Sequence, residues 1–215
     1  YVSFGLGEGN RVTAANISAD WRHFDVLCDG SFYCHLDLGV LGRHNAMNAL
    51  AVAATSWVMK IPGEAVSKGV EAFHGAGRRM EFKGTYHGAQ VYDDYAHHPD
   101  ELRATLEAIR SMGDHRVVLA FQPHTYTRTK LLMDDFIREL KKADVVVLAE
   151  IYAARESNTI GISSADLAAQ IPGSVYCETL QDVTETLRKI VKEGDIVVTM
   201  GAGDIFRAGE ALLAE

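Results

Sequence analysis

The chain has 215 residues, of which 47% are hydrophobic and 23% are charged, so its length allows one large domain or two small ones with an ordinary core. The formal net charge of −8 excludes the broad basic surface with which proteins neutralise nucleic-acid phosphates, and we expect no nucleic-acid partner. The most apolar stretch, 49–59, is much shorter than the ~20 residues of a membrane-spanning helix, so we expect no insertion into a membrane.

The cysteines and the first residues predict the cellular compartment of the protein. Three cysteines without a CxxC pair are typical of a reducing cytosol, and residues 1–10 lack the basic start of a secretory signal. We therefore expect a cytoplasmic protein. The chain opens on a strand-like segment without an initiator Met, which predicts that it is a fragment of a longer protein.

The first 75 residues predict short strands followed by two helices. Up to residue 38, β-rich runs alternate with the turn segments GLGEGN and CDGS. HNAMNALAVAATSWVM (44–59) has the composition and length of a buried helix, and Pro62 opens a second helix that ends near His74. The glycines and arginines of GAGRR (75–79) predict a domain boundary.

Residues from 80 onward predict alternating strands and helices. A hairpin over 80–95 turns near residues 86–88. Apolar strands at 117–121, 144–150 and 195–200 alternate with predicted helices, which follow Pro99 and cover 129–142, 165–171, 180–193 and the last residues. Such strands, apolar throughout, are typical of a doubly wound, mainly parallel sheet. The predicted fold class is therefore α/β.

Two glycine-rich loops, 5–10 and 201–206, begin GxG, as dinucleotide-binding fingerprints do. Both lack the third glycine of the fingerprint, because Asn10 and Phe206 stand at its position. The second loop lies between a strand and a helix, so its amides either face an anion or simply close the connection. No GxxxxGK[ST] motif occurs, so we expect the main triphosphate cradle to lie outside this chain.

Two asparagines precede the apolar part of the first predicted helix. Asn45 and Asn48 share a helix face because they are three residues apart. Asn is unfavourable inside a helix, where its side chain competes for backbone hydrogen bonds. A single Asn would only cap the helix, whereas two beside His44 predict an amide pair directed at a ligand such as an adenine edge.

The segment VYDDYAHHPDEL (91–102) gathers two aspartates, a tyrosine and two histidines at a strand end ahead of a helix. Adjacent strand residues point to opposite faces, so Asp93 and Asp94 have different roles, and one of them is a candidate for an exposed position. Asp100 is a candidate helix cap. The spacing of the histidines and aspartates matches no known zinc pattern, and we predict no metal site.

The segment FQPHTYTRT (121–129) follows an apolar strand and precedes a helix. In open α/β sheets, ligands bind at the carboxyl ends of the strands. Arg128, near the helix start, suits a phosphate or a carboxylate. An exposed arginine beside threonine caps is an equally weighted alternative.

The chain resembles the Mur ligase family in six segments, which occur in the family's order from about residue 42 to 205: GRHNAMNALA, FHGAGRRMEFKG, VYDDYAHHPDEL, FQPHTYTRTKLLMDDF, EIYAARE and GAGDI. The resemblance is closest to members that join L-alanine to UDP-N-acetylmuramate with ATP in peptidoglycan precursor synthesis. It implies that residues 1–77 are the end of the central ATPase domain and residues 78–215 the Rossmann-like C-terminal domain.

The resemblance also implies what this chain lacks and how the complete enzyme works. The P-loop, most Mg²⁺ ligands and the UDP-binding domain would lie outside the chain, so we expect the fragment alone to be inactive. ATP activates the muramoyl carboxylate as an acyl phosphate, which the amine of alanine then attacks. Positioned cations stabilise the oxyanion that develops.

Nucleotide-binding roles follow from the same resemblance. Asn45 and Asn48 match asparagines that the family places at the nucleotide, with His44 beside them. Arg79 matches an interdomain arginine that approaches the ATP phosphates. Asp94 matches an aspartate at the ATP ribose.

Tyr95, His97 and Arg128 match positions near the muramoyl–alanine end, and His97 is also the candidate general base. Thr125 stands where some members have an arginine, which leaves Arg128 as the only arginine in its segment.

Three alternatives stay open. A related recycling ligase attaches a whole tripeptide to UDP-N-acetylmuramate, and it usually has a different segment in place of FQPHTYTRT. A nicotinamide- or flavin-dependent oxidoreductase is favoured only by the fold class and the GxG loops. A non-catalytic nucleotide-binding module is a further alternative, which the isolated fragment could itself be.

Overall fold

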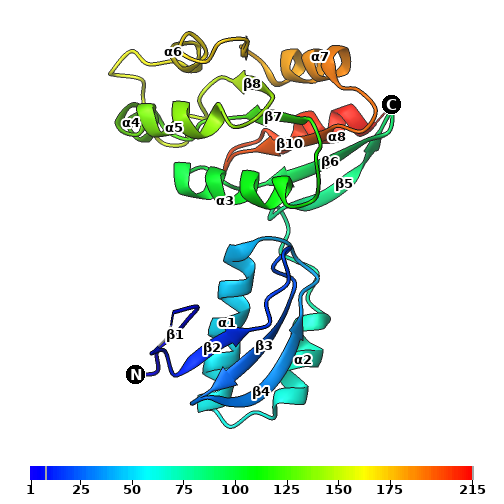
Figure 1. Ribbon diagram of the computed structural model, residues 1–215. Helices are drawn as coiled ribbons and strands as arrows, with labels where there is room; N and C mark the ends of the chain where they lie inside the picture. Colours follow the sequence, from blue (N-terminus) through cyan, green and yellow to red (C-terminus); the bar gives the residue numbers. More distant parts are fainter. Residues whose placement is uncertain (8, 215) are drawn as a thin grey trace. The chain divides into compact units, whose positions relative to one another are not determined.

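The computed structural model describes residues 1–7 and 9–214, which divide between Gly75 and Ala76 into two compact units (Figure 1). We call Tyr1–Gly75 the N-terminal unit and the part from Ala76 onward the C-terminal unit. Each unit has its own sheet and its own hydrophobic core. The predicted α/β class is confirmed.

The N-terminal unit is a four-stranded sheet followed by two helices, as the sequence predicts. Its elements are β1 (Phe4–Gly5), β2 (Val12–Ala15), β3 (His23–Cys28), β4 (Ser31–Asp37), α1 (Arg43–Val58) and α2 (Gly63–Glu71). The strands lie in chain order; β1 and β2 are parallel, and the other pairs are antiparallel.

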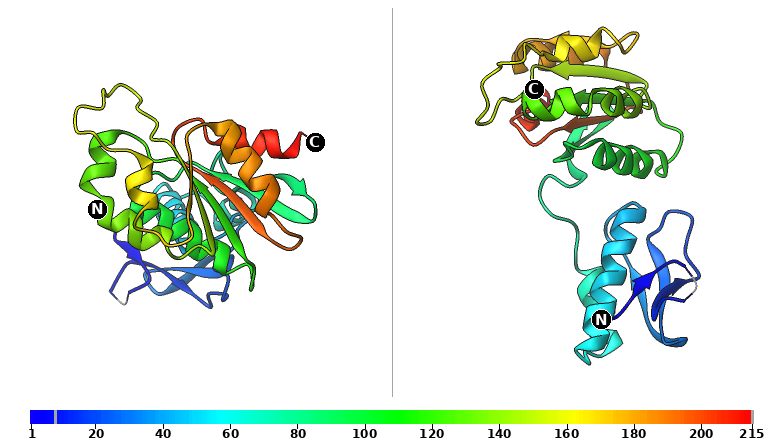
Figure 2. Two further views of the ribbon diagram at one scale, coloured as in Figure 1. Left: turned by 90° about the horizontal axis from the view of Figure 1, so that it is seen from above. Right: turned by 90° about the vertical axis from the view of Figure 1, so that its left-hand side faces the viewer.

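Strand alternation gives this small sheet one apolar and one polar face. Phe24 and Val26 of β3 are buried and pack with Leu50 of α1, whereas His23 and Asp25 do not enter that core. Figure 2 shows α1 lying along one side of the sheet. The polar side chains of β3 and β4 therefore gather on the opposite face.

The C-terminal unit is a six-stranded sheet with the order β5-β6-β10-β7-β8-β9. Its strands are β5 (Glu81–Tyr86), β6 (Ala89–Asp94), β7 (Val117–Phe121), β8 (Val145–Ala149), β9 (Val175–Cys177) and β10 (Ile196–Met200). Its helices are α3 (Pro99–Arg110), α4 (Tyr126–Leu131), α5 (Met133–Leu140), α6 (Ser164–Ala168), α7 (Leu180–Ile190) and α8 (Phe206–Leu213). All neighbouring strands are parallel except β5, which is antiparallel to β6.

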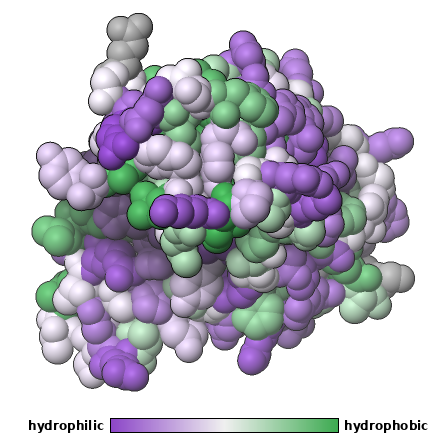
Figure 3. All heavy atoms as spheres, turned by 90° about the horizontal axis from the view of Figure 1, so that it is seen from below, coloured by the Kyte–Doolittle hydropathy of each residue, from purple (hydrophilic) through white to green (hydrophobic). Residues whose placement is uncertain are grey.

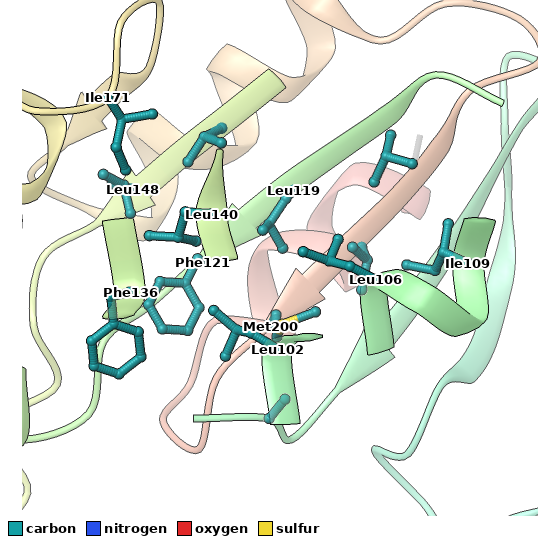
Figure 4. Close-up of a cluster of buried hydrophobic side chains, with 14 of the residues drawn as sticks. Leu102, Leu106, Ile109, Leu119, Phe121, Phe136, Leu140, Leu148, Ile171 and Met200 are labelled. Carbon is teal, nitrogen blue, oxygen red and sulfur yellow. The ribbon is translucent and has the colours of Figure 1, made fainter. Parts of the chain in front are cut away.

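Helices cover both faces of this sheet (Figure 2). On one face, side chains of α3 and α5 meet those of β7, β8 and β10 (Figure 4). The labelled members of that core are Leu102, Leu106, Ile109, Leu119, Phe121, Phe136, Leu140, Leu148, Ile171 and Met200. On the other face, α7 and α8 pack through Val183, Leu187 and Leu212. Burial on both faces explains why the central strands are apolar throughout.

The predicted hairpin is confirmed, and its turn shows why it forms. β5 and β6 are joined by His87 and Gly88, whose φ angles are +47° and +82°. Two consecutive positive φ angles define the type I′ turn, whose twist matches that of paired strands. Glycine reaches this conformation without strain.

Three local details differ from the sequence prediction. The helix predicted over 129–142 begins at Tyr126 and divides into α4 and α5 at Leu132, where φ is −107°. The strand β9 was not predicted, because it has only three residues and two of them are exposed. His98, rather than Asp100, caps α3: its ring accepts a hydrogen bond from the Asp100 amide.

Within the described residues, no helix combines the length and the apolar character needed to cross a membrane. Figure 3 shows a face of the molecule on which hydrophobic side chains are interspersed with hydrophilic ones. Interspersed exposure of this kind is ordinary for protein surfaces.

Candidate active site

The candidate site of the C-terminal unit lies where β6, β7, β8 and β10 end. The chain adds β7, β8 and β9 towards one edge of the sheet and then returns, so that the last strand, β10, lies between β6 and β7. Open α/β sheets bind ligands at the carboxyl ends of strands beside such a reversal. The segments 95–98, 122–128 and 201–205 follow the ends of β6, β7 and β10.

Arg78 connects the end of β6 to the loop that follows β10. Its Nε donates to Asp93 Oδ2 at 2.8 Å, and its two Nη atoms donate to the carbonyls of Gly203 (3.1 Å) and Gly201 (2.7 Å). The guanidinium also lies 4.6 Å from the ring centroid of Phe206. Only 1% of the Asp93 side chain is exposed, and Arg78 is its charge partner. The pair therefore belongs to the framework of the site.

Arg79, the neighbour of Arg78, is different. Its side chain is exposed, and its guanidinium lies 5.6 Å from the ring centroid of Tyr95. Of the two adjacent arginines, Arg79 is thus the one whose side chain is open to solvent.

Asp94 is buried like Asp93, which corrects the expectation that one of the two would be exposed. Asp94 Oδ2 accepts the amide of Met80 and Oδ1 accepts the amide of Ala96, each at 2.8 Å. Burial raises the pKa of the Asp94 carboxyl, and the two backbone donors partly offset that effect. The two aspartates do have different partners, as the strand alternation predicted.

A row of rings follows the ends of β6, β7 and β8. Ring centroids are 5.5 Å apart for Tyr95 and His97, 5.9 Å for His97 and His124, and 5.6 Å for His124 and Tyr152. His97 Nδ1 lies 3.0 Å from the carbonyl oxygen of Tyr95. A carbonyl oxygen only accepts, so Nδ1 carries the proton, and the Nε2 lone pair of a neutral ring is left for another partner.

Two buried nitrogen atoms beside this row have no hydrogen-bond partner among the described residues: His124 Nδ1 and Arg128 Nη1. Buried polar atoms are nearly always paired, so each such exception calls for an explanation. Burial, followed by the charge of Arg128, lowers the pKa of His124. A guanidinium N–H without a partner, beside an imidazole nitrogen that can also donate, suits an anion such as a carboxylate or a phosphate.

Glu156 fixes the start of α4, the helix that carries Arg128. Its carboxylate accepts the Thr127 amide at 2.9 Å and the Thr127 hydroxyl, and these bonds lower the pKa of Glu156. Thr125, just before the helix, has a φ of +69°, a left-handed conformation that is costly for a threonine. Arg128 is therefore held by an ordered turn.

The loop 201–204 closes against Gln122. Gln122 Oε1 accepts the amides of Asp204 (3.0 Å) and Ile205 (3.2 Å), and Gln122 Nε2 donates to Asp204 Oδ1 at 3.0 Å. The sequence left open whether the amides of this glycine-rich loop face an anion. At Asp204 and Ile205 they face a protein side chain.

Gly203 is expected to tolerate no larger residue. A Cβ at this position would overlap Gln122 Oε1 and lie 2.7 Å from Cγ of the Tyr152 ring. We expect Gly203→Ala to lower the free energy of unfolding of the C-terminal unit by about 1–3 kcal/mol, as overpacking does. Urea denaturation measures this. Gly69→Ala is the control, because nothing lies within 4 Å of its added Cβ; equal stabilities of the two variants would contradict the packing argument.

The remaining predicted site residues lie on α1 of the N-terminal unit. Asn45 Nδ2 donates to the carbonyl of Leu41 at 2.8 Å, and Asn48 Nδ2 lies 3.5 Å from Asn45 Oδ1. The two amides therefore share a helix face, as predicted, and Asn48 and His44 are exposed.

Sequence reasoning missed His124, Tyr152 and Glu156 as members of the site. His124 stands within FQPHTYTRT, and the position of its ring between His97 and Tyr152 appears only when the strand ends come together. Tyr152 and Glu156 lie in EIYAARE, a segment that carried the resemblance without a role for any of its residues.

The chain is similar in sequence to known Mur ligases over most of its length. Residues 78–203 match the family described as "Mur ligase, glutamate ligase domain". The UDP-N-acetylmuramate–L-alanine ligase of Lachnospira eligens is 47% identical over 194 residues, which cover 88% of this chain and 42% of that protein.

Solved structures give the same result for the fold. The UDP-N-acetylmuramate-alanine ligase of Thermotoga maritima superposes with a TM-score of 0.82 at 27% identity, over 99% of this chain and 47% of that one. A murein peptide ligase from Psychrobacter arcticus, at 24% identity, shares the fold with a TM-score of 0.66, over 98% of this chain and 45% of that one. The chain spans about half the length of the curated relatives it matches.

Proposed function

Because this chain belongs to the Mur ligase family, we propose that it is part of an ATP-dependent ligase that joins L-alanine to UDP-N-acetylmuramate in cytoplasmic peptidoglycan precursor synthesis. The observation that carries the proposal is the pair of buried, unpartnered nitrogen atoms of His124 and Arg128 at the end of β7. They suit the anionic end of such a substrate. The names of the relatives, such as the Lachnospira eligens ligase, support alanine as the amino acid.

The substrate end of the site would comprise Tyr95, His97, His124 and Arg128. A guanidinium held by an ordered turn can bind the muramoyl carboxylate and stabilise the oxyanion that forms when the amine attacks. His97 is the candidate to receive a proton from that amine, because its Nε2 lone pair is left for another partner.

The nucleotide end would comprise Arg79 and Asp94 of the C-terminal unit. Arg79 is exposed and can approach the ATP phosphates. Asp94 accepts two backbone amides, but a carboxylate offers about four acceptor sites, so it can still accept a ribose hydroxyl. The amide pair of Asn45 and Asn48, with His44, is proposed for the adenine.

Magnesium has no evident place among the carboxylates of the C-terminal site. Asp93 is buried and already accepts bonds from Arg78 and Thr199, and Asp94 is assigned above to the ribose. We assign no Mg²⁺ ligand to them, and the Mg²⁺ ligands of the reaction would belong to other parts of the complete enzyme. We likewise propose that residues 1–77 belong to its ATPase domain and residues 78–215 are its C-terminal domain.

The proposal is tested in a chimera. The segment of the Lachnospira eligens ligase that this chain matches is replaced by the chain, and ADP release is measured with UDP-N-acetylmuramate and L-alanine. We expect ADP release that requires both substrates. A folded chimera that binds ATP but releases no ADP with L-alanine would overturn the proposal. The 215 residues alone serve as the control, and we expect them to show no turnover.

A further inference from the structure

The polar face of the N-terminal sheet carries two H-x-D triplets on neighbouring antiparallel strands: His23 to Asp25 in β3 and His35 to Asp37 in β4. In the register of the pair, His23 stands opposite Asp37, and Asp25 stands opposite His35. The four side chains therefore form a square of alternating imidazoles and carboxylates. No step of the proposed ligase reaction uses it.

Both imidazoles of this square point to the same oxygen atom. His23 Nδ1 lies 2.5 Å and His35 Nε2 lies 3.3 Å from Asp37 Oδ1. One atom from each of these three residues lies within 4.8 Å of the others. Their side chains are between 47% and 51% exposed, so an ion from solvent can reach them.

The hydrogen bonds behind His35 fix which of its nitrogens faces the shared oxygen. Asp25 Oδ1 lies 2.7 Å from His35 Nδ1, and Asn16 Nδ2 donates to Asp25 Oδ2 at 2.6 Å. A carboxylate only accepts, so His35 Nδ1 carries a proton, and in the neutral ring Nε2 presents a lone pair to Asp37. Two acceptors face to face repel each other unless a cation, either a second proton or a metal ion, lies between them.

We propose that His23, His35 and Asp37 form a binding site for a divalent first-row transition-metal ion, with Asp25 orienting His35 from behind. Two imidazole nitrogens and one carboxylate oxygen suit Zn²⁺, Ni²⁺ or Cu²⁺ and do not suit Mg²⁺. A carboxylate that accepts from the far nitrogen of a ligand histidine is the usual support of such sites.

One of the two distances fits this assignment as it stands, and the other requires a small movement. Ligand atoms of a tetrahedral zinc ion with bonds of about 2.0 Å stand about 3.3 Å apart, which is the separation of His35 Nε2 and Asp37 Oδ1. The proton on His23 Nδ1 would pass to Nε2 of the same ring or to solvent, and the nitrogen would move away from Asp37 by roughly 0.8 Å on this geometry. It can do so because it lies at an exposed position. Water or another exogenous ligand would complete the shell.

The buried thiols of this unit do not compete for the ion. Cys28 and Cys34 lie in the core of the sheet. Burial raises the pKa of the Cys34 thiol to about 11, so it stays protonated near neutral pH. Metal binding requires the thiolate.

The test is isothermal titration of the purified, metal-free protein with Zn²⁺ in the presence of millimolar Mg²⁺. We expect one saturable site that Mg²⁺ does not occupy. His23→Asn and His35→Asn should each weaken Zn²⁺ binding at that site at least tenfold, and Asp25→Asn should weaken it by about 10–100-fold. Circular dichroism confirms that the variants fold.

His87→Asn is the matched control, because His87 lies in the turn of the other unit with a φ of +47°, which Asn accepts. It should bind Zn²⁺ as the unaltered protein does. The absence of saturable uptake by the unaltered protein would overturn the proposal. So would the same affinity in His23→Asn, His35→Asn and the control. Neither outcome bears on the ligase activity, since no residue of the square belongs to that site.

Discussion

Replacing Arg78 with alanine is expected to destabilise the C-terminal unit by about 3–5 kcal/mol, the usual cost of leaving a buried charge without its partner. The Asp93 carboxylate would keep only the Thr199 hydroxyl, at 2.7 Å, among the side-chain donors that the structure gives it. The carbonyls of Gly201 and Gly203 would lose their guanidinium donor as well. The loop that closes on Gln122 should loosen with them.

Urea denaturation can separate this effect from changes in the other unit. Both tryptophans, Trp21 and Trp57, belong to the N-terminal unit, so tryptophan fluorescence follows that unit while far-UV circular dichroism follows both. In Arg78→Ala, we expect the urea midpoint measured by fluorescence, which reports the N-terminal unit, to be unchanged. The dichroism change that belongs to the C-terminal unit should occur at a lower urea concentration. The control is Arg79→Ala, which removes an exposed guanidinium and should change stability by less than about 0.5 kcal/mol. Equal losses in both variants would show that Arg78 is not the internal partner of Asp93.

The second large effect concerns activity. In the chimera, Arg128→Lys should lower kcat/KM for UDP-N-acetylmuramate or L-alanine about tenfold to a hundredfold, since loss of a hydrogen bond to a charged group costs about 1.5–3 kcal/mol. Lysine keeps the charge but lacks the planar fork that binds a carboxylate. The ATP KM should change much less.

The matched control for Arg128→Lys is Arg103→Lys, in α3. Arg103 is exposed and pairs only with Asp100 among the ion pairs of the described residues. It should have unaltered kinetics. Unaltered kinetics for Arg128→Lys as well would remove Arg128 from the substrate site.

The order of strands and helices could be predicted from the sequence because a strand that is buried on both faces is a continuous run of apolar residues. Every residue of β7 and β10 is buried, and both strands were predicted from their apolar runs. The strand β9 has no such apolar run, since Val175 and Tyr176 are exposed and only Cys177 faces the core. The break at Leu132 was equally hidden, because α4 and α5 together read as one amphipathic helix.

Candidate site residues could be named from the sequence where a single segment carries the chemistry, and they were overlooked where distant segments meet. Strand alternation in the sequence indicates that Asp93 and Asp94 have different surroundings. It does not indicate that both are buried, because their partners are distant in the sequence: Arg78 and Thr199 for Asp93, and the Met80 amide for Asp94. A lone histidine such as His124 is usually a satisfied core residue. Only the fold shows that its Nδ1 is buried without a partner.

The amino acid that the enzyme joins to UDP-N-acetylmuramate tests the central claim most directly. The chimera is given ATP, UDP-N-acetylmuramate, and equal concentrations of L-alanine and of the tripeptide that a recycling ligase would attach, and the products are identified by mass spectrometry. We predict that UDP-N-acetylmuramoyl-L-alanine is the main product and that Arg128→Lys lowers its yield. A product that carries the tripeptide, formed in preference to the alanine product, would contradict the account and assign the chain to the recycling ligases instead.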